Sequence, residues 1–147
     1  MIIIGDEHLS PKIVRAVRDI ALRKAWRFDN IAGSDLCSLE DEDWIESFAK
    51  IGGNAIVSAD RAMLKRPTLM SKISDLGIIG IYLPAEWANA RRQYQAAHIL
   101  YWWPRIEYAI ESSAPGTAWI VPKGFAPTSD LRQHIERSDA KLAKRDS

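Results

Sequence analysis

Residues 1–11 read MIIIGDEHLSP, and the interpretation of the whole chain starts from this stretch. Ile2 to Gly5 predicts a short, branched, apolar strand of the kind found in the middle of a parallel sheet. The Ser-Pro pair at 10–11 is typical of a helix N-cap followed by the first helical position. The stretch therefore predicts the start of a βαβ unit, with Asp6 and Glu7 at the carboxyl end of its strand.

The same alternation of strand and helix continues along the chain. Four further strands are predicted at 25–28, 55–58, 77–83 and 117–121, and helices at 11–21, 40–51, 67–74 and 86–111. Pro104 should kink the last helix or begin a new one. The expected fold is a three-layer α/β/α arrangement with a mostly parallel central sheet of about five strands, formed by residues 1–124. The charged residues 125–147 are expected to be a tail or a helix.

Composition limits the kind of protein. With 147 residues, 47% of them hydrophobic, the chain can bury the core of one domain. Its 20 basic and 19 acidic residues give no global field for coating nucleic acid. The single cysteine, Cys37, excludes an internal disulfide, and no leader or membrane-spanning stretch is visible, so a cytoplasmic protein without membrane contact is expected.

Three carboxylates are candidates for one site. Asp6 ends the first strand and Asp60 follows the third, and in such sheets ligands bind at the carboxyl ends of the strands. Asp41 lies in the acidic cluster EDEDW at 40–44, on the same helical stripe as the apolar residues that follow it. Converging carboxylates repel one another unless a cation lies between them, and hard cations such as Mg²⁺ or Mn²⁺ take oxygen ligands. Alternatively, each acid is only a helix or turn cap.

Basic and aromatic side chains near these acids suggest contacts with a polyanion. Ser58, Arg61, Lys65 and Arg66 are candidates for holding phosphates, although a solvated basic loop explains them equally well. The aromatic and basic residues within 91–103 are interpreted as core or oligomer interface in preference to a base-stacking surface.

Three segments together resemble a known family: IIIGDEHLSPKIVRAVR, DEDWIESFAKIGGNAIVSADRAM and LGIIGIYL. Their order and spacing over residues 1–85 are similar to those of PIN-like domains, close to the VapC-type ribonuclease toxins of bacterial toxin–antitoxin pairs. Carried over residue by residue, Asp6, Asp41 and Asp60 match the metal-binding acids of that family. One departure is that Arg61, Ala62 and Met63 follow where relatives often have a further acid.

The resemblance implies a Mg²⁺- or Mn²⁺-dependent endoribonuclease that hydrolyses phosphodiester bonds. Asp6, Asp41 and Asp60 would be the catalytic and metal-binding residues, with Glu7, Ser58, Arg61 and Lys65 as supporting or substrate-binding residues. Implied partners are an RNA substrate and a cognate antitoxin, and homodimers are common among such proteins.

Two alternatives stay open. The missing fourth acid is compatible with a PIN-like module that has lost catalysis and only binds RNA or a protein. Signal-receiver domains share this sheet architecture, and Asp6–Glu7, Asp60 and Lys123 mimic their acidic pair, phosphoacceptor and lysine. Against the receiver interpretation, the fourth strand ends in Leu83 and Pro84 without the expected Ser or Thr, and Asp41 has no role.

Overall fold

Six strands form one sheet in the computed structural model of the chain, which describes residues 1–87 and 89–135. The spatial order is β2-β1-β3-β4-β5-β6, and every neighbouring pair is parallel except β5 and β6. The strands are β1 (Ile2–Gly5), β2 (Arg27–Asn30), β3 (Ala55–Ser58), β4 (Ile79–Tyr82), β5 (Ala118–Ile120) and β6 (Arg132–His134). Strand β1 lies between β2 and β3, so Asp6 lies at the carboxyl edge of the sheet with a paired strand on each side.

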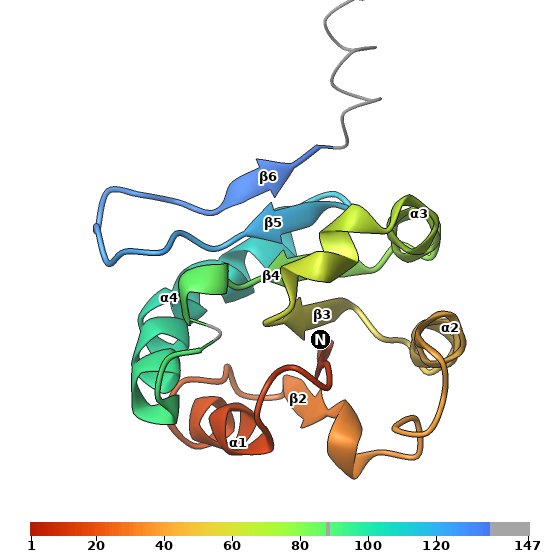
Figure 1. The fold of residues 1–147 in the computed structure, drawn as a ribbon, viewed down its shortest axis with the longest axis horizontal. Helices are drawn as coiled ribbons and strands as arrows, with labels where there is room; N and C mark the ends of the chain where they lie inside the picture. The colour runs from red at the N-terminus through yellow and green to blue at the C-terminus, as the bar shows by residue number, and fades with distance from the viewer. Residues whose placement is uncertain (88, 136–147) are drawn as a thin grey trace, which may run out of the picture.

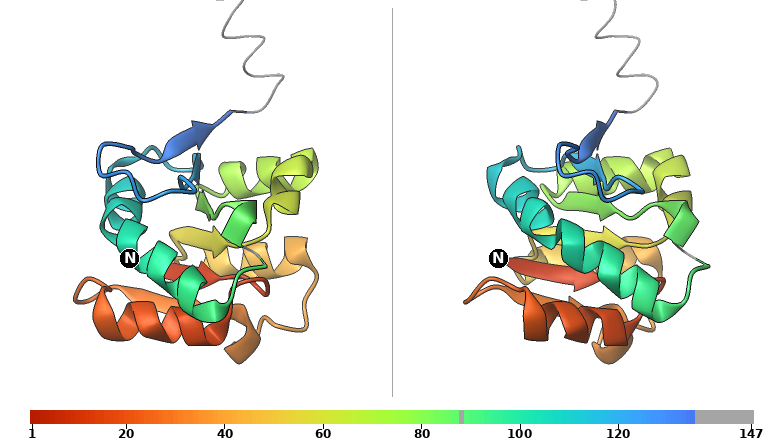
Figure 2. Two further views of the ribbon diagram at one scale, coloured as in Figure 1. Left: turned by 60° about the vertical axis from the view of Figure 1, so that its left-hand side comes forward. Right: turned by 90° about the vertical axis from the view of Figure 1, so that its left-hand side faces the viewer.

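Four α-helices cover the two faces of the sheet. Helices α1 (Pro11–Ile20) and α4 (Arg92–Ser112) pack on one face, and α2 (Asp41–Lys50) and α3 (Pro67–Asp75) on the other (Figure 1). Figure 2 shows the parallel strands from the side, with their arrowheads directed toward one edge. The 3₁₀ turns η2 (Arg61–Lys65) and η3 (Ala85–Trp87) lie at this edge, and η1 (Ile31–Gly33) follows β2. These layers confirm the predicted α/β fold.

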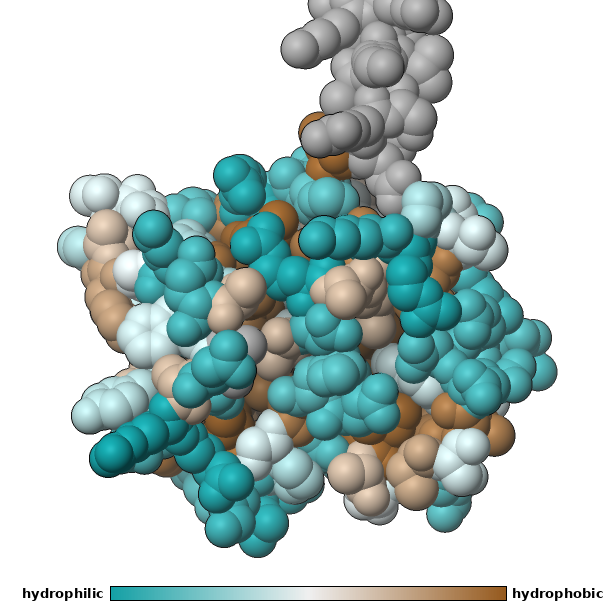
Figure 3. Space-filling model, viewed as in Figure 1, coloured by the Kyte–Doolittle hydropathy of each residue, from teal (hydrophilic) through white to brown (hydrophobic). Residues whose placement is uncertain are grey.

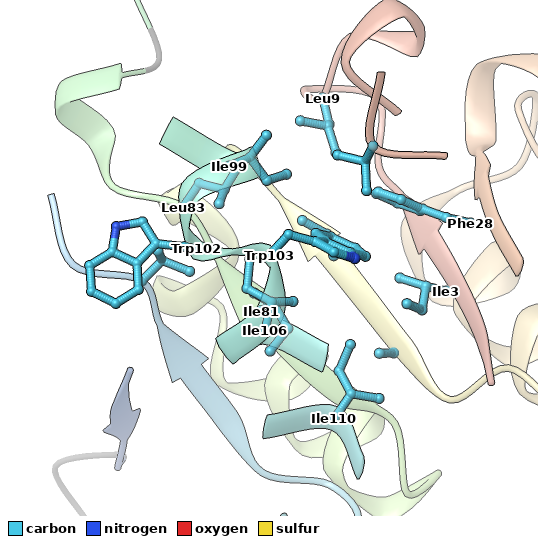
Figure 4. Packing of buried hydrophobic residues seen from close by; sticks show 14 of the residues in the cluster. Ile3, Leu9, Phe28, Ile81, Leu83, Ile99, Trp102, Trp103, Ile106 and Ile110 are labelled. Carbon is cyan, nitrogen blue, oxygen red and sulfur yellow. The ribbon is translucent and has the colours of Figure 1, made fainter. Parts of the chain in front are cut away.

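Each face of the sheet has its own hydrophobic core, because the side chains of a strand alternate between faces. Ile3 joins the core under α1 and α4, where Phe28 and Trp103 stack with ring centroids 5.0 Å apart (Figure 4). Ile4 points the other way, into the core under α2 and α3 with Ile45 and Phe48. The apolar side chains on both sides of β1 are therefore buried.

Local sequence signals explain where elements begin and end. The Ser10 hydroxyl accepts a hydrogen bond from the backbone N–H of Lys12, with Pro11 at the first position of α1. Helix α2 ends before Gly52, whose φ of +88° is left-handed backbone that glycine adopts without strain. In β4, a Cβ at Gly80 would lie 2.6 Å from the ring of Tyr82, so this glycine makes room for a buried aromatic side chain.

Three elements differ from the prediction. Strand β2 starts at Arg27 and extends to Asn30, because Phe28 is the residue of this segment that enters the core. Helix α4 runs through Pro104 without interruption. A sixth strand, β6, forms at Arg132–His134 within the segment expected to be a tail or a helix. Residues 136–147 of that segment lie outside the described residues, and the domain boundary at 124 stays a prediction.

The aromatic stretch in α4 divides between interior and surface. Trp102 and Trp103 are fully buried, whereas Tyr94 and Tyr101 are exposed. The part of the stretch with the largest rings therefore belongs to the core, as expected. Among the described residues, no helix combines the length and apolarity needed to cross a membrane.

Candidate functional site

Asp6 is the centre of the candidate site. It follows β1 directly, and its backbone N–H donates to the carbonyl of Val57 in β3, 3.1 Å away. The strand pairing thus fixes the position of its carboxylate at the carboxyl edge. The side chain is only 2% exposed, which is unusual for an aspartate outside an ion pair. Burial raises the pKa of Asp6 to about 6, although hydrogen bonds and nearby His8 partly oppose the shift.

Ser58, the last residue of β3, links Asp6 to Asp60. Its hydroxyl donates to the Asp6 carboxylate and accepts from the backbone N–H of Asp60 at 3.0 Å. Ser58 is fully buried, so its hydroxyl has no competition from solvent. Ser58 thus holds the ends of β1 and β3 in a fixed relation, and its predicted supporting or substrate-binding role stays a prediction.

Asp60 and His8 form the solvent-facing side of the site. The side chain of Asp60 caps η2 by accepting from the backbone N–H of Ala62 at 2.8 Å. Its other carboxylate oxygen lies 3.2 Å from His8 Nε2, and the same nitrogen lies 3.5 Å from Glu7. The capping interpretation of Asp60 is therefore correct, yet one of its oxygens remains directed toward the shared site.

Asp41 begins α2 and is held by a cation from another element. Arg66 Nη1 lies 2.6 Å from its carboxylate, and Arg66 Nη2 lies 2.9 Å from Glu42. The indole N–H of Trp44 donates to Asp41 at 3.0 Å. These two carboxylates raise the pKa of Arg66. Because Arg66 is shared with Glu42, it offsets only part of the negative charge at this helix start.

One cavity of about 620 Å³ connects these groups. Its lining includes all three predicted acids, Asp6, Asp41 and Asp60, together with Glu7, His8 and Arg66. Hydrophilic side chains cover much of this face of the molecule in the space-filling view (Figure 3). The topology thus brings together acids that lie far apart in the sequence, because β1, β3 and the start of α2 all end or begin at one edge.

In the part of the chain that the structure describes, the site has the type of side chain that binds a hard divalent cation, but not the close grouping that such an ion needs. Carboxylate oxygens are the ligands that Mg²⁺ and Mn²⁺ prefer. Because Asp6 is buried away from water, a bound cation would stabilise its charge the most. Within residues 1–87 and 89–135, however, no three His, Cys, Asp or Glu side chains are grouped closely enough to hold a metal ion. Because Arg66 binds Asp41, Asp6 and Asp60 are the two acids of the site that a cation would reach without displacing Arg66.

Two of the remaining predicted residues, Arg61 and Lys65, do not line the cavity that contains the acids. Arg61 lines a neighbouring cavity, and Lys65 is exposed at the end of η2. The pairing of Arg66 with Asp41 was not visible in the sequence, because a contact across 25 residues leaves no local pattern. His8, in the loop after β1, is half exposed and contacts two acids, Glu7 and Asp60.

The receiver alternative finds little geometric support. The lysine it needs, Lys123, does not line the acidic cavity, and its backbone carbonyl accepts from the indole N–H of Trp87 at 2.8 Å. Asp41, which has no role in a receiver, does line that cavity. The strand order is nonetheless shared with the doubly wound folds to which receivers belong.

Comparison with known proteins tests the family directly. Neither the curated proteins nor the solved structures that were searched contain a match to the chain. A family model described as "PIN like domain" matches residues 1–85, which include β1 to β4 and all three acids of the site. Because this match spans more than half of the 147 residues, the chain belongs to the PIN-like domain family.

Proposed function

We propose that the chain is a Mg²⁺- or Mn²⁺-dependent endoribonuclease. The observation that carries this proposal is the position of Asp6: a buried carboxylate at the carboxyl end of β1, linked through Ser58 to Asp60, in one cavity with Asp41. Family membership supports a nuclease-type fold. Burying a carboxylate is costly, and a ligand cation offsets that cost.

The residues of the site have distinct roles in this proposal. Asp6 and Asp60 would hold the cation, and Asp41 would join them once Arg66 releases it. When bound, the cation supplies an activated water and stabilises charge on the leaving oxygen. Ser58 fixes the spacing of Asp6 and Asp60. His8, beside Asp60 and half exposed, is placed to donate a hydrogen bond to a phosphate oxygen.

The biological role proposed here is that of the toxin in a toxin–antitoxin pair, acting in the cytoplasm. It rests on the resemblance to VapC-type proteins. An antitoxin and a second copy of the chain are the corresponding partners. Expression in a bacterium should then arrest growth, and Asp6→Asn should abolish the arrest.

RNA cleavage by the full chain is the direct test. Single-stranded RNA should be cleaved with Mn²⁺ and left intact with EDTA, and Asp6→Asn and Asp60→Asn should each lower the rate by at least about 100-fold, the scale of losing a charge-stabilising group. Asp43→Asn is the matched control, since Asp43 is an exposed acid in the first turn of α2 that does not line the cavity. Equal rates in Asp6→Asn and Asp43→Asn would contradict the proposal.

A module that binds without cleaving is the second candidate. The ion pair between Arg66 and Asp41 favours it, because a cation of the chain already binds one of the three acids. It predicts no Mn²⁺-dependent cleavage and no change in Mn²⁺ affinity between Asp6→Asn and Asp43→Asn, measured by calorimetry.

A further inference from the structure

A second cavity lies beside the acidic one, at the same edge of the sheet. It has a volume of about 550 Å³ and is lined by residues that follow β3, β4 and β5 and by the start of β6. Arg61 lines it, and the adjacent Asp60 lines the acidic cavity, so the two cavities meet at this pair of residues. The proposed cleavage chemistry uses none of the side chains of this second cavity.

Three cations line the second cavity. In residues 1–87 and 89–135, the side chains of Arg61, Lys123 and Arg132 make no hydrogen bond or ion pair with the protein. Arg66, in contrast, is fully engaged by Asp41 and Glu42. Two carboxylates also line the cavity, Glu86 and Asp130, so its five charged side chains leave one positive charge in excess. Unpaired cations that share a cavity favour an anionic ligand.

The antiparallel direction of β6 brings one of these cations to the carboxyl edge. Arg132 is the first residue of β6 and pairs with Ile120, the last residue of β5. A parallel strand at this position would direct its first residue to the opposite edge of the sheet. The additional strand thus extends the row of cations from β3 across to β6.

The loop that carries Lys123 is anchored through its carbonyl groups. The carbonyls of Pro122 and Lys123 bond to His98 Nε2 and Trp87 Nε1, at 2.7 and 2.8 Å. The carbonyl of Gly124 accepts from Trp102 Nε1 at 2.8 Å. These carbonyl contacts fix the backbone around Lys123 without using its side chain. A wall that is already ordered loses little entropy when a ligand binds.

From this geometry we infer that the second cavity holds the phosphate backbone of single-stranded RNA next to the cleavage site. The inference rests on the proposed nuclease function and adds the path of the substrate. Neighbouring strands are about 4.8 Å apart, so β3 and β5 are separated by about 10 Å, a span that covers more than one phosphate. The RNA backbone runs from Asp60 past Arg61 and on to Lys123 and Arg132.

Salt-dependent RNA binding tests the path without requiring cleavage. The probe is a fluorescein-labelled, unstructured RNA of about 20 nucleotides, long enough to cover the binding surface of a small domain, titrated with the full chain in EDTA and followed by anisotropy. Each phosphate contact on a single strand contributes about 0.7 to the slope of log K against log salt. Lys123→Gln should therefore lower the slope by about 0.7, and Lys123→Gln with Arg132→Gln by about 1.4.

Matched controls come from cations outside the cavity. Lys24→Gln and Arg15→Gln each remove one exposed positive charge from a position that does not line it, and both should leave the slope unchanged. Denaturant unfolding of every variant checks that the fold is intact. Equal slopes for the Lys123→Gln and Lys24→Gln variants would overturn the inference, and so would failure of the wild-type chain to bind RNA.

The outcomes separate this inference from the proposed function. If the RNA binds with the expected loss of slope and Mn²⁺ gives no cleavage, the path stands and the nuclease proposal fails. If RNA is cleaved with Mn²⁺ and the slope is insensitive to Lys123→Gln, the nuclease stands and the path is wrong.

Discussion

At the scale of single residues, Asp6 combines burial with negative charge. Its hydrogen bonds from Ser58 and from the backbone N–H of His8 stabilise the carboxylate, but they do not outweigh its desolvation, and the pKa rises to about 6. In the unfolded chain the same group titrates near 3.8. At neutral pH the folded protein therefore carries a charge that opposes folding.

This shift predicts how Asp6→Asn changes stability with pH. Between about pH 4 and 6 the folded state binds more protons than the unfolded state, so stability falls as pH rises through this window. Asn is neutral at every pH in this window, so the variant does not lose stability through this titration. The variant should gain up to about 3 kcal/mol in free energy of unfolding at pH 8, relative to wild type, and little below pH 4, because one pKa unit corresponds to about 1.4 kcal/mol.

Urea unfolding at pH 4 and pH 8 is the measurement. Asp43→Asn controls for the loss of a negative charge at an exposed position. A constant difference between Asp6→Asn and wild type at the two pH values would contradict a raised pKa at Asp6.

At the scale of elements, Arg66 joins the start of α3 to the start of α2 through Asp41 and Glu42. If Asp41 is a metal ligand, Arg66 competes with the cation for it. Arg66→Gln should then raise Mn²⁺ affinity by up to about fivefold, because solvent screens this exposed ion pair and keeps its contribution small. Calorimetric titration checks this, with Arg27→Gln as control because Arg27 pairs with Asp29, outside the cavity. Unchanged affinity in Arg66→Gln would remove Asp41 from the metal site.

Helix α4 carries a second element-scale prediction, at Pro104. The helix is continuous there although proline has no N–H to donate to the carbonyl of Leu100. Pro104→Ala should raise the free energy of unfolding by about 1–2 kcal/mol, because the restored hydrogen bond outweighs the extra freedom of the unfolded chain. Ala97→Gly, at an exposed position of the same helix, should lower it by about 1 kcal/mol in the same denaturant titration. A less stable Pro104→Ala variant would mean that packing of the proline ring matters more than the hydrogen bond.

The elements that sequence patterns located well are those with a strong local signal. Strands β1 and β3 are uninterrupted apolar runs, and α1 has both a capping serine and a periodic apolar face. Strand β6 reads Arg-Gln-His, with no apolar alternation, and it exists because β5 offers it an open edge. No pattern within three polar residues identifies such a strand.

At the scale of the whole molecule, the convergence of Asp6 and Asp60 on one cavity followed from fold class, whereas Asp41 was added by its place on a helical stripe and by the family resemblance. In a parallel sheet the strand ends share an edge, so acids placed after strands are brought together. The partners of those acids were not predictable. The contacts of Arg66 with Asp41 and of His8 with Asp60 join residues far apart in the sequence, and only the folded chain brings them within reach.

Removing residues 125–147 tests the predicted domain boundary at 124. This truncation deletes β6 and leaves the backbone groups of β5 unpaired along the edge of the sheet. An unpaired edge favours pairing with another chain, so the truncated protein should form larger species at concentrations where the full chain does not. Light scattering with size-exclusion chromatography measures this, and a chain ending at 135 isolates the contribution of β6. Identical elution of all three chains would contradict the expectation.

Both outermost strands of the sheet, β2 and β6, are short and rich in charged or polar side chains. Such strands are poor templates for further strand addition, because extending the sheet would bring charges of successive chains face to face. We therefore expect Arg132–His134 to hinder the addition of a further strand, while one of them, Arg132, lines the second cavity. Replacing this strand with a more apolar sequence would make the sheet more stable and the protein less soluble.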